Sequence, residues 1–114
     1  MRVKCRSETE VVVERIALYA GSLRALADLQ RSDLSAFKQA CATLCASDHQ
    51  SVFIDLNRCA YISSLFIGEL AEAVMQMTAA GKDVHVEVSP EIGKTLHMAR
   101  LYHLFDYEIC SELL

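Results

Sequence analysis

The sequence predicts an α/β domain in which helices pack on a mixed, largely parallel sheet of four to five strands. Two observations indicate this class. Short β-branched segments alternate along the chain with segments of helical apolar spacing, and strands joined through helices need crossovers that make neighbouring strands parallel. The expected order is β-β-α-β-α-β-α, with a final strand as an open alternative. At 114 residues the chain has the length of one domain, so residues 1–114 are expected to form a single unit.

The first two strands are expected at residues 2–5 and 11–20, with the polar turn SETE between them. Such a pair would form an antiparallel hairpin. Gly21 ends the second strand, and the segment SLRALADLQR that follows has no clear pattern. A helix is predicted over residues 33–47, because apolar residues recur there at i, i+3 and i+4 and a serine and an aspartate at its start are available as N-cap.

The middle of the chain predicts a buried strand followed by a long helix. Residues 51–57, SVFIDLN, are short, apolar and β-branched. Helical spacing runs over residues 64–80, and Gly81 stands where helices commonly end in a left-handed residue. The residues expected to face inward from this helix are Leu65, Ile67 or Gly68, Leu70, Ala71, Val74 and Met77.

The last third predicts a strand, a helix and a short final strand. Residues 82–88, KDVHVEV, alternate between valine and polar side chains. Ser89 and Pro90 indicate a helix start, since serine is a preferred N-cap and proline suits the first helical position. This helix is expected to end between residues 101 and 103, and residues 104–110 could add a strand. Its inward residues are expected to be Ile92, Leu96, Met98 and Ala99.

Composition excludes several classes of function. The net charge is −4 and the 11 basic residues are spread along the chain, whereas a nucleic-acid surface needs clustered Lys and Arg. No apolar run reaches the roughly 18–20 residues that cross a bilayer, and the start MRVKCRSETE lacks the apolar region of a signal peptide. We therefore expect a soluble, cytoplasmic protein that binds no nucleic acid and does not insert into membranes.

Five scattered cysteines without a CxxC pair are typical of reduced, mostly buried thiols rather than of a disulfide scaffold. Cys41, Cys45 and His49 share helical spacing, but the cysteines belong to the apolar stripe and no fourth ligand has suitable spacing. His97 and His103 lie at the end of a helix, where basic residues meet the helix dipole. With no phosphate loop or nucleophile motif, we expect no metal, no cofactor and no enzymatic activity.

An ordered set of motifs carries a resemblance to a known family. The segment VFIDLNRCAYISSLFIGEL, the later SPEIGKTLHMARLYHLF, and a preceding strand ending in Gly21 resemble the STAS domain of anti-sigma-factor antagonists. The resemblance spans residues 11–107. Asp55 matches the strand aspartate of the family, Ser64 matches the position of its phosphorylated serine, and Gly68 matches the last glycine of its motif. Ser89-Pro90 and the ending at residues 101–105 match the later landmarks.

The resemblance implies a STAS-like fold and a non-catalytic role in partner switching. A partner of the anti-sigma-factor type with serine-kinase activity would phosphorylate Ser64, with Ser63 as the second acceptor candidate, and a separate phosphatase would reverse the modification. The partner would bind the edge formed by the start of the helix over 64–80 and the loop after Gly21. The residues expected there are Arg24, Ser63, Ser64, Leu65 and Phe66.

The chain also departs from the family motif D-S-S-G. Ser63 replaces the acid, and Leu65 and Phe66 replace small residues, a feature shared with scaffold-type STAS proteins. The alternative function is therefore a constitutive structural subunit of a signalling scaffold or of a lipid-transport ATP-binding-cassette complex, without phosphorylation. Assembly as a homodimer or larger complex stays open.

Two interpretations of the serines remain at this stage. Either they only cap a helix, a role worth about 1 kcal/mol, or one of them accepts a phosphate that the helix dipole tolerates. Ser63 is predicted as the cap and Ser64 as the acceptor. For Leu65 and Phe66, burial in the core is favoured, and whichever is exposed would contact the partner.

Overall fold

The computed structural model describes residues 10–101, 103 and 105–109. Within them the chain forms one mixed sheet with three α-helices, which confirms the α/β class. The strands are β1 (Val11–Val13), β2 (Ile16–Tyr19), β3 (Ser22–Ala25), β4 (Ser51–Leu56), β5 (Asp83–Val88) and β6 (Glu108–Ile109). The helices are α1 (Leu34–Ala46), preceded by a 3₁₀ turn (Arg31–Asp33), α2 (Ser64–Ala79) and α3 (Pro90–Met98).

The strands lie side by side in their order along the chain, from β1 to β6. The pairs β1–β2 and β2–β3 are antiparallel. The pairs β3–β4, β4–β5 and β5–β6 are parallel, because a helix crosses over between the strands of each pair. The mixed, largely parallel sheet is thus confirmed, with six described strands instead of the four to five expected.

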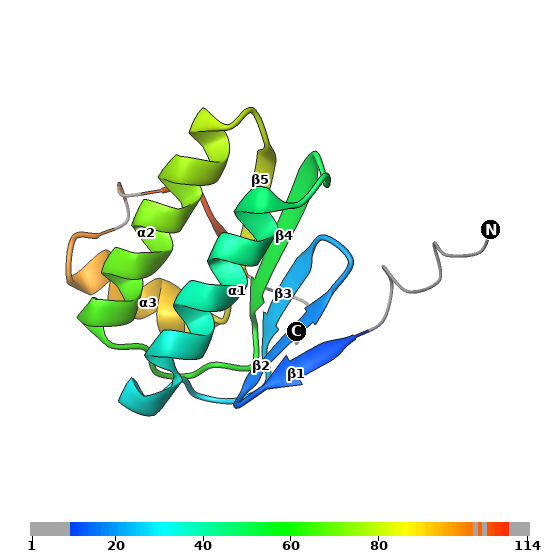
Figure 1. Cartoon of the computed structure of the whole chain (residues 1–114). Coiled ribbons are helices and arrows are strands. Elements are labelled where there is room, and N and C mark those ends of the chain that lie inside the picture. The colour runs from blue at the N-terminus through cyan, green and yellow to red at the C-terminus, as the bar shows by residue number, and fades with distance from the viewer. Residues whose placement is uncertain (1–9, 102, 104, 110–114) are drawn as a thin grey trace.

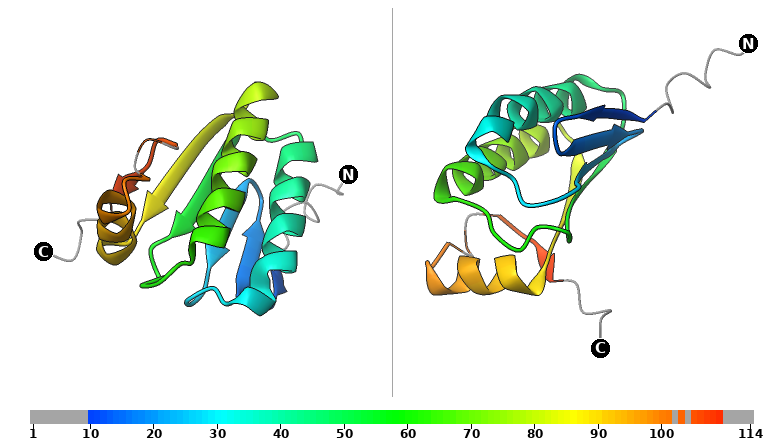
Figure 2. Two further views of the ribbon diagram at one scale, coloured as in Figure 1. Left: turned by 90° about the vertical axis from the view of Figure 1, so that its left-hand side faces the viewer. Right: turned by 90° about the horizontal axis from the view of Figure 1, so that it is seen from below.

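Helices α1 and α2 pack side by side on one face of the sheet, and α3 lies beside β5 and β6 (Figures 1 and 2). The rings of Phe37 on α1 and Phe66 on α2 meet edge to face, with centroids 5.3 Å apart. Alternate strand positions fill the core beneath the helices, which is the expected pattern of a sheet with one covered face. These positions are Leu23, Ala25, Val52, Ile54, Leu56, Val86 and Val88.

The N-terminal elements differ from the prediction. Residues 11–20, expected as one strand, form the hairpin β1–β2, in which Glu14 adopts a left-handed φ of 58°. The segment after Gly21, which had no clear pattern, opens with β3. A β-carbon on Gly21 would lie 2.8 Å from the carbonyl oxygen of Ser51, so β3 and β4 approach closely here. The strand expected at 2–5 lies outside the described residues.

The later elements agree with the prediction except at the end of α3. The helices expected over 33–47 and 64–80 and the strand over 82–88 are within two residues of α1, α2 and β5. Helix α3 begins at Pro90 with Ser89 as cap, but it ends at Met98 rather than at 101–103. Arg100 adopts φ 60° and the amide of Leu101 donates to the Leu96 carbonyl oxygen, which closes the helix without the usual glycine.

Met98 and Ala99, expected inward, are exposed because they follow the last buried turn of α3. Helix α2 likewise keeps Ile67, Leu70, Ala71 and Met77 in the core but not Leu65. Within the described part of the chain, none of the helices combines the length and the apolar character needed to cross a membrane.

Candidate functional site

The candidate site lies where the parallel strands β3 and β4 end. In open α/β sheets, ligands commonly bind at the carboxyl ends of the strands. Two loops leave the sheet here: residues 26–30 lead from β3 toward α1, and residues 57–63 lead from β4 into α2.

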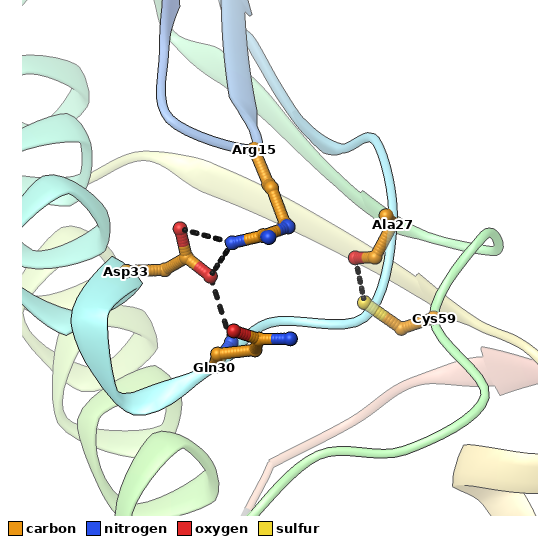
Figure 3. Close-up of polar contacts among 5 residues, drawn as sticks. All are labelled: Arg15, Ala27, Gln30, Asp33 and Cys59. Atoms are coloured by element: carbon orange, nitrogen blue, oxygen red, sulfur yellow. Dashed lines mark hydrogen bonds and ion pairs between the residues drawn. The ribbon is translucent and has the colours of Figure 1, made fainter.

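Hydrogen bonds hold the two loops together. One carboxylate oxygen of Asp28 accepts from the backbone amides of Ala60, at 2.6 Å, and Tyr61, at 3.2 Å. The Cys59 thiol donates to the carbonyl oxygen of Ala27 at 3.1 Å (Figure 3). The position of the loop before α2 therefore depends on the loop after β3.

A buried carboxylate anchors the start of α1 beside these loops. Asp33 is fully buried, and its Oδ2 accepts from the backbone amide of Gln30 at 2.7 Å and from Arg15 Nη1 at 3.1 Å (Figure 3). Arg15 comes from the turn between β1 and β2. Since a buried carboxylate needs such partners, this contact ties the hairpin to the helix start next to the site.

The two serines take different places at the start of α2. Ser63 is the N-cap: it has extended backbone angles, and its Oγ accepts from the Phe66 amide at 3.4 Å. This confirms Ser63 as the predicted cap, although the bond is longer than the usual 2.7–3.2 Å range. Ser64 is the first residue of the helix and is exposed, so its hydroxyl is accessible from solvent.

Leu65 lies at the surface, whereas its neighbour Phe66 lies in the core. Phe66 is 1% exposed and contacts Phe37 in the core, which confirms the favoured prediction of burial and removes Phe66 from the residues that could contact a partner. Leu65 is 48% exposed, so the prediction that it packs inward is wrong. Of the two, Leu65 is available for contact beside Ser64.

A groove of about 560 Å³ runs past the exposed serine. Its walls come from both loops and from the first turn of α2. Tyr61, 62% exposed, and Leu65 give the groove apolar surface, and Arg31 gives it a positive charge. The full lining is Asp28, Leu29, Gln30, Arg31, Tyr61, Ser63, Ser64 and Leu65.

The structure places Arg24 outside this groove. Its guanidinium donates to Glu10 at 3.2 Å, and its side chain lines a separate hollow together with Tyr19, Phe53 and Asp55. The basic residue at the groove is Arg31, the last residue of the segment that had no clear pattern in the sequence. The strand over residues 22–25 was not predicted. Had it been, the loop that follows it, and Arg31 with it, would have been expected at the carboxyl edge of the sheet.

The described cysteines are free thiols rather than disulfides. Burial is the main cause that raises the pKa of Cys59 from 9.0 to about 11, with smaller contributions from Asp28 and Asp55. Burial, followed by the charge of Glu69, raises the pKa of Cys41 to about 12. Both thiols stay protonated at neutral pH, which makes them poor nucleophiles and poor metal ligands.

No protein-family model and no curated protein sequence matches this chain.

Proposed function

We propose that this protein is a non-catalytic regulatory domain, similar to the STAS domains of anti-sigma-factor antagonists, that binds a protein partner and is switched by phosphorylation of Ser64. The observation that carries the proposal is the exposed Ser64 at the first position of a capped helix, on the rim of a groove with exposed apolar side chains. The partner is an anti-sigma factor with serine-kinase activity, and a separate phosphatase resets the switch.

The order of elements supports the resemblance. From β3 onward, strands and helices alternate, as the resemblance implies. Asp55 is the penultimate residue of β4, Ser64 is the first residue of α2, and Ser89 caps α3, which begins at Pro90.

The start of α2 suits a phosphorylated side chain. The first-turn amides of a helix lack intrahelical partners and carry partial positive charge, which stabilises an anion by about 0.3–2 kcal/mol. Arg31 lines the same groove as Ser64 and offers a guanidinium that can pair with phosphate oxygens. Asp28 and Arg31 carry opposite charges in this lining, so phosphorylation would give the groove a net negative charge without unfolding the helix.

The same modification would change partner binding. Tyr61 and Leu65 line the groove with Ser64; tyrosine is enriched among the anchor residues of interfaces, and Leu65 adds exposed apolar surface beside it. A phosphate placed between them adds about 1.5–2 negative charges at pH 7. Burying those charges against an apolar partner surface is costly, so the phosphorylated protein would release a partner that the unmodified protein binds.

The test is phosphorylation with candidate anti-sigma kinases and ATP, followed by intact-mass measurement. We expect the mass of one phosphoryl group on the unmodified protein and on Ser63→Ala, and none on Ser64→Ala. Phosphorylation that persists in Ser64→Ala would exclude Ser64 as the acceptor. A kinase that modifies a known substrate but leaves this protein unmodified counts against the switch.

The second candidate is a constitutive structural subunit of a signalling scaffold or a lipid-transport complex. The observation that favours it is the exposed Leu65 directly after the serine, where the family motif has a small residue. If Ser64→Asp and Ser64→Ala bind a partner as tightly as the unmodified protein does, the serine only contributes to the helix start and the structural role is correct.

A further inference from the structure

A second group of functional side chains lies on β5 and β6, apart from the groove. His85 and Glu87 stand two residues apart on β5, so they project from the same face of the sheet. Glu108 on β6 pairs directly with Glu87 in the sheet register. The ligand atoms of these three side chains lie within 4.8 Å of one another.

The distances suit a small cation bound between them. His85 Nε2 lies 3.8 Å from Glu87 Oε2 and 3.5 Å from Glu108 Oε1. Zinc binds imidazole nitrogen and carboxylate oxygen at about 2.0–2.2 Å in tetrahedral sites, which separates neighbouring ligand atoms by roughly 3.4 Å. The three ligand atoms lie within 4.8 Å of one another, so side-chain rotations of Glu87 and Glu108 would have to bring them to that separation.

Neighbouring residues hold two of the three ligands in place. The ring of Phe53 on β4 stacks on His85, with centroids 5.1 Å apart and planes 12° from parallel. Asn57 Nδ2 donates to Glu87 Oε1 at 2.7 Å, which leaves Oε2 facing the histidine. Such supporting contacts orient ligands in metal sites.

One further observation concerns the charges around the three ligands. Asp55, Glu87 and Glu108 occupy directly opposed positions on three adjacent strands, and like charges in such positions destabilise a sheet. A cation at the centre of the cluster would offset the repulsion within this row of carboxylates.

We propose that His85, Glu87 and Glu108 form a zinc site with three protein ligands. A mixed imidazole and carboxylate set suits Zn²⁺ better than Mg²⁺ or Ca²⁺, which prefer oxygen alone. Because the cluster faces solvent, water occupies the fourth position. The ion links β6, a strand of two residues, to β5 and so stabilises that edge of the sheet.

The test is calorimetric titration of the untagged full-length chain with zinc sulfate, together with the melting temperature at increasing zinc concentration. Thiolates also bind zinc, so accessible cysteines are alkylated first. We expect one equivalent of zinc to bind and the melting temperature to rise with zinc concentration. Glu108→Gln and His85→Gln should weaken binding at least about tenfold.

The matched control is Glu72→Gln, an exposed glutamate of α2 outside the cluster, which should bind zinc as the unmodified protein does. Glu108 is 69% exposed, so its replacement leaves the core intact and a circular dichroism spectrum can verify folding. Absence of zinc binding, or equal binding by Glu108→Gln and the unmodified protein, would overturn the proposal.

Discussion

Leu65 and Phe66 are neighbours in the chain with opposite environments, because successive residues of an α-helix point about 100° apart. Phe66 points toward α1 and fills the core, whereas Leu65 points along the groove. The sequence predicts Leu65 on the inward face and favours burial of both residues, but the structure buries only Phe66. Only the packing of α1 against α2 selects Phe66.

This difference predicts opposite effects of two adjacent substitutions. Phe66→Ala should lower the free energy of unfolding by about 3–5 kcal/mol, because it leaves a cavity in the core. Leu65→Ala should change it by no more than about 0.5 kcal/mol, as for other surface positions, but should weaken binding of the proposed partner. Urea unfolding and a partner titration measure the two quantities. Equal destabilisation by both substitutions would contradict the assignment of the surface.

At the scale of the elements, two glycines have different roles. Gly21 lies in the turn between β2 and β3, next to β4. Its carbonyl oxygen accepts from the Phe53 amide at 2.9 Å, and a β-carbon at this position would collide with the backbone of Ser51. Gly68 lies inside α2 with open space around it. Gly21 is therefore required by the contact between β3 and β4, whereas Gly68 only weakens its helix.

Alanine substitution should separate these roles. Gly21→Ala should destabilise the protein by about 1–3 kcal/mol, since the backbone must shift to admit the methyl group. Gly68→Ala is the matched control and should stabilise it by up to about 1 kcal/mol through helix propensity. Thermal or urea unfolding measures both changes. Stabilisation by Gly21→Ala would show that β3 does not approach β4 as described.

At the scale of the whole molecule, the site depends on contacts between segments far apart in the chain. Asp28 positions the loop before α2, Arg15 and Asp33 connect the hairpin to α1, and the Ser89 hydroxyl donates to the Cys59 carbonyl oxygen. Three successive crossovers thus meet at one edge of the sheet. Displacement of any one of these loops would change the groove beside Ser64.

The buried thiols of Cys41 and Cys59 predict how the free energy of unfolding depends on pH. Their folded pKa values, about 11 for Cys59 and about 12 for Cys41, lie above the ordinary 9.0. Below pH 9 both states keep the protons, so the full stability is present. Above pH 9 the unfolded state loses them first, and stability falls until the pH passes the folded values. Cys41→Ala should reduce the slope of this decline.

Urea unfolding between pH 7 and 11 measures the slope, and Cys45→Ala, at a half-buried position on the same helix, is the control. The comparison concerns the change with pH rather than the absolute stability, because each substitution also removes packing. An identical slope in Cys41→Ala and the unmodified protein would contradict the burial of that thiol.

The sequence by itself determined the features that depend on residues a few positions apart. The alternation over 82–88, the helical spacing over 33–47 and 64–80, and the caps Ser63 and Ser89 correspond to observed elements, with bounds that differ by at most one residue. These signals are local, since capping and periodicity act within one or two turns. They were enough to establish the α/β class and the junction that contains the two serines.

The tertiary structure decided which distant segments meet. It divided residues 11–20 into a hairpin, added β3, and placed Arg31 rather than Arg24 at the groove. It also brought Glu108 beside His85 and Glu87 across 20 residues of sequence. The physical reason is that sheet order and register depend on packing between elements, and no pattern confined to one element contains that information.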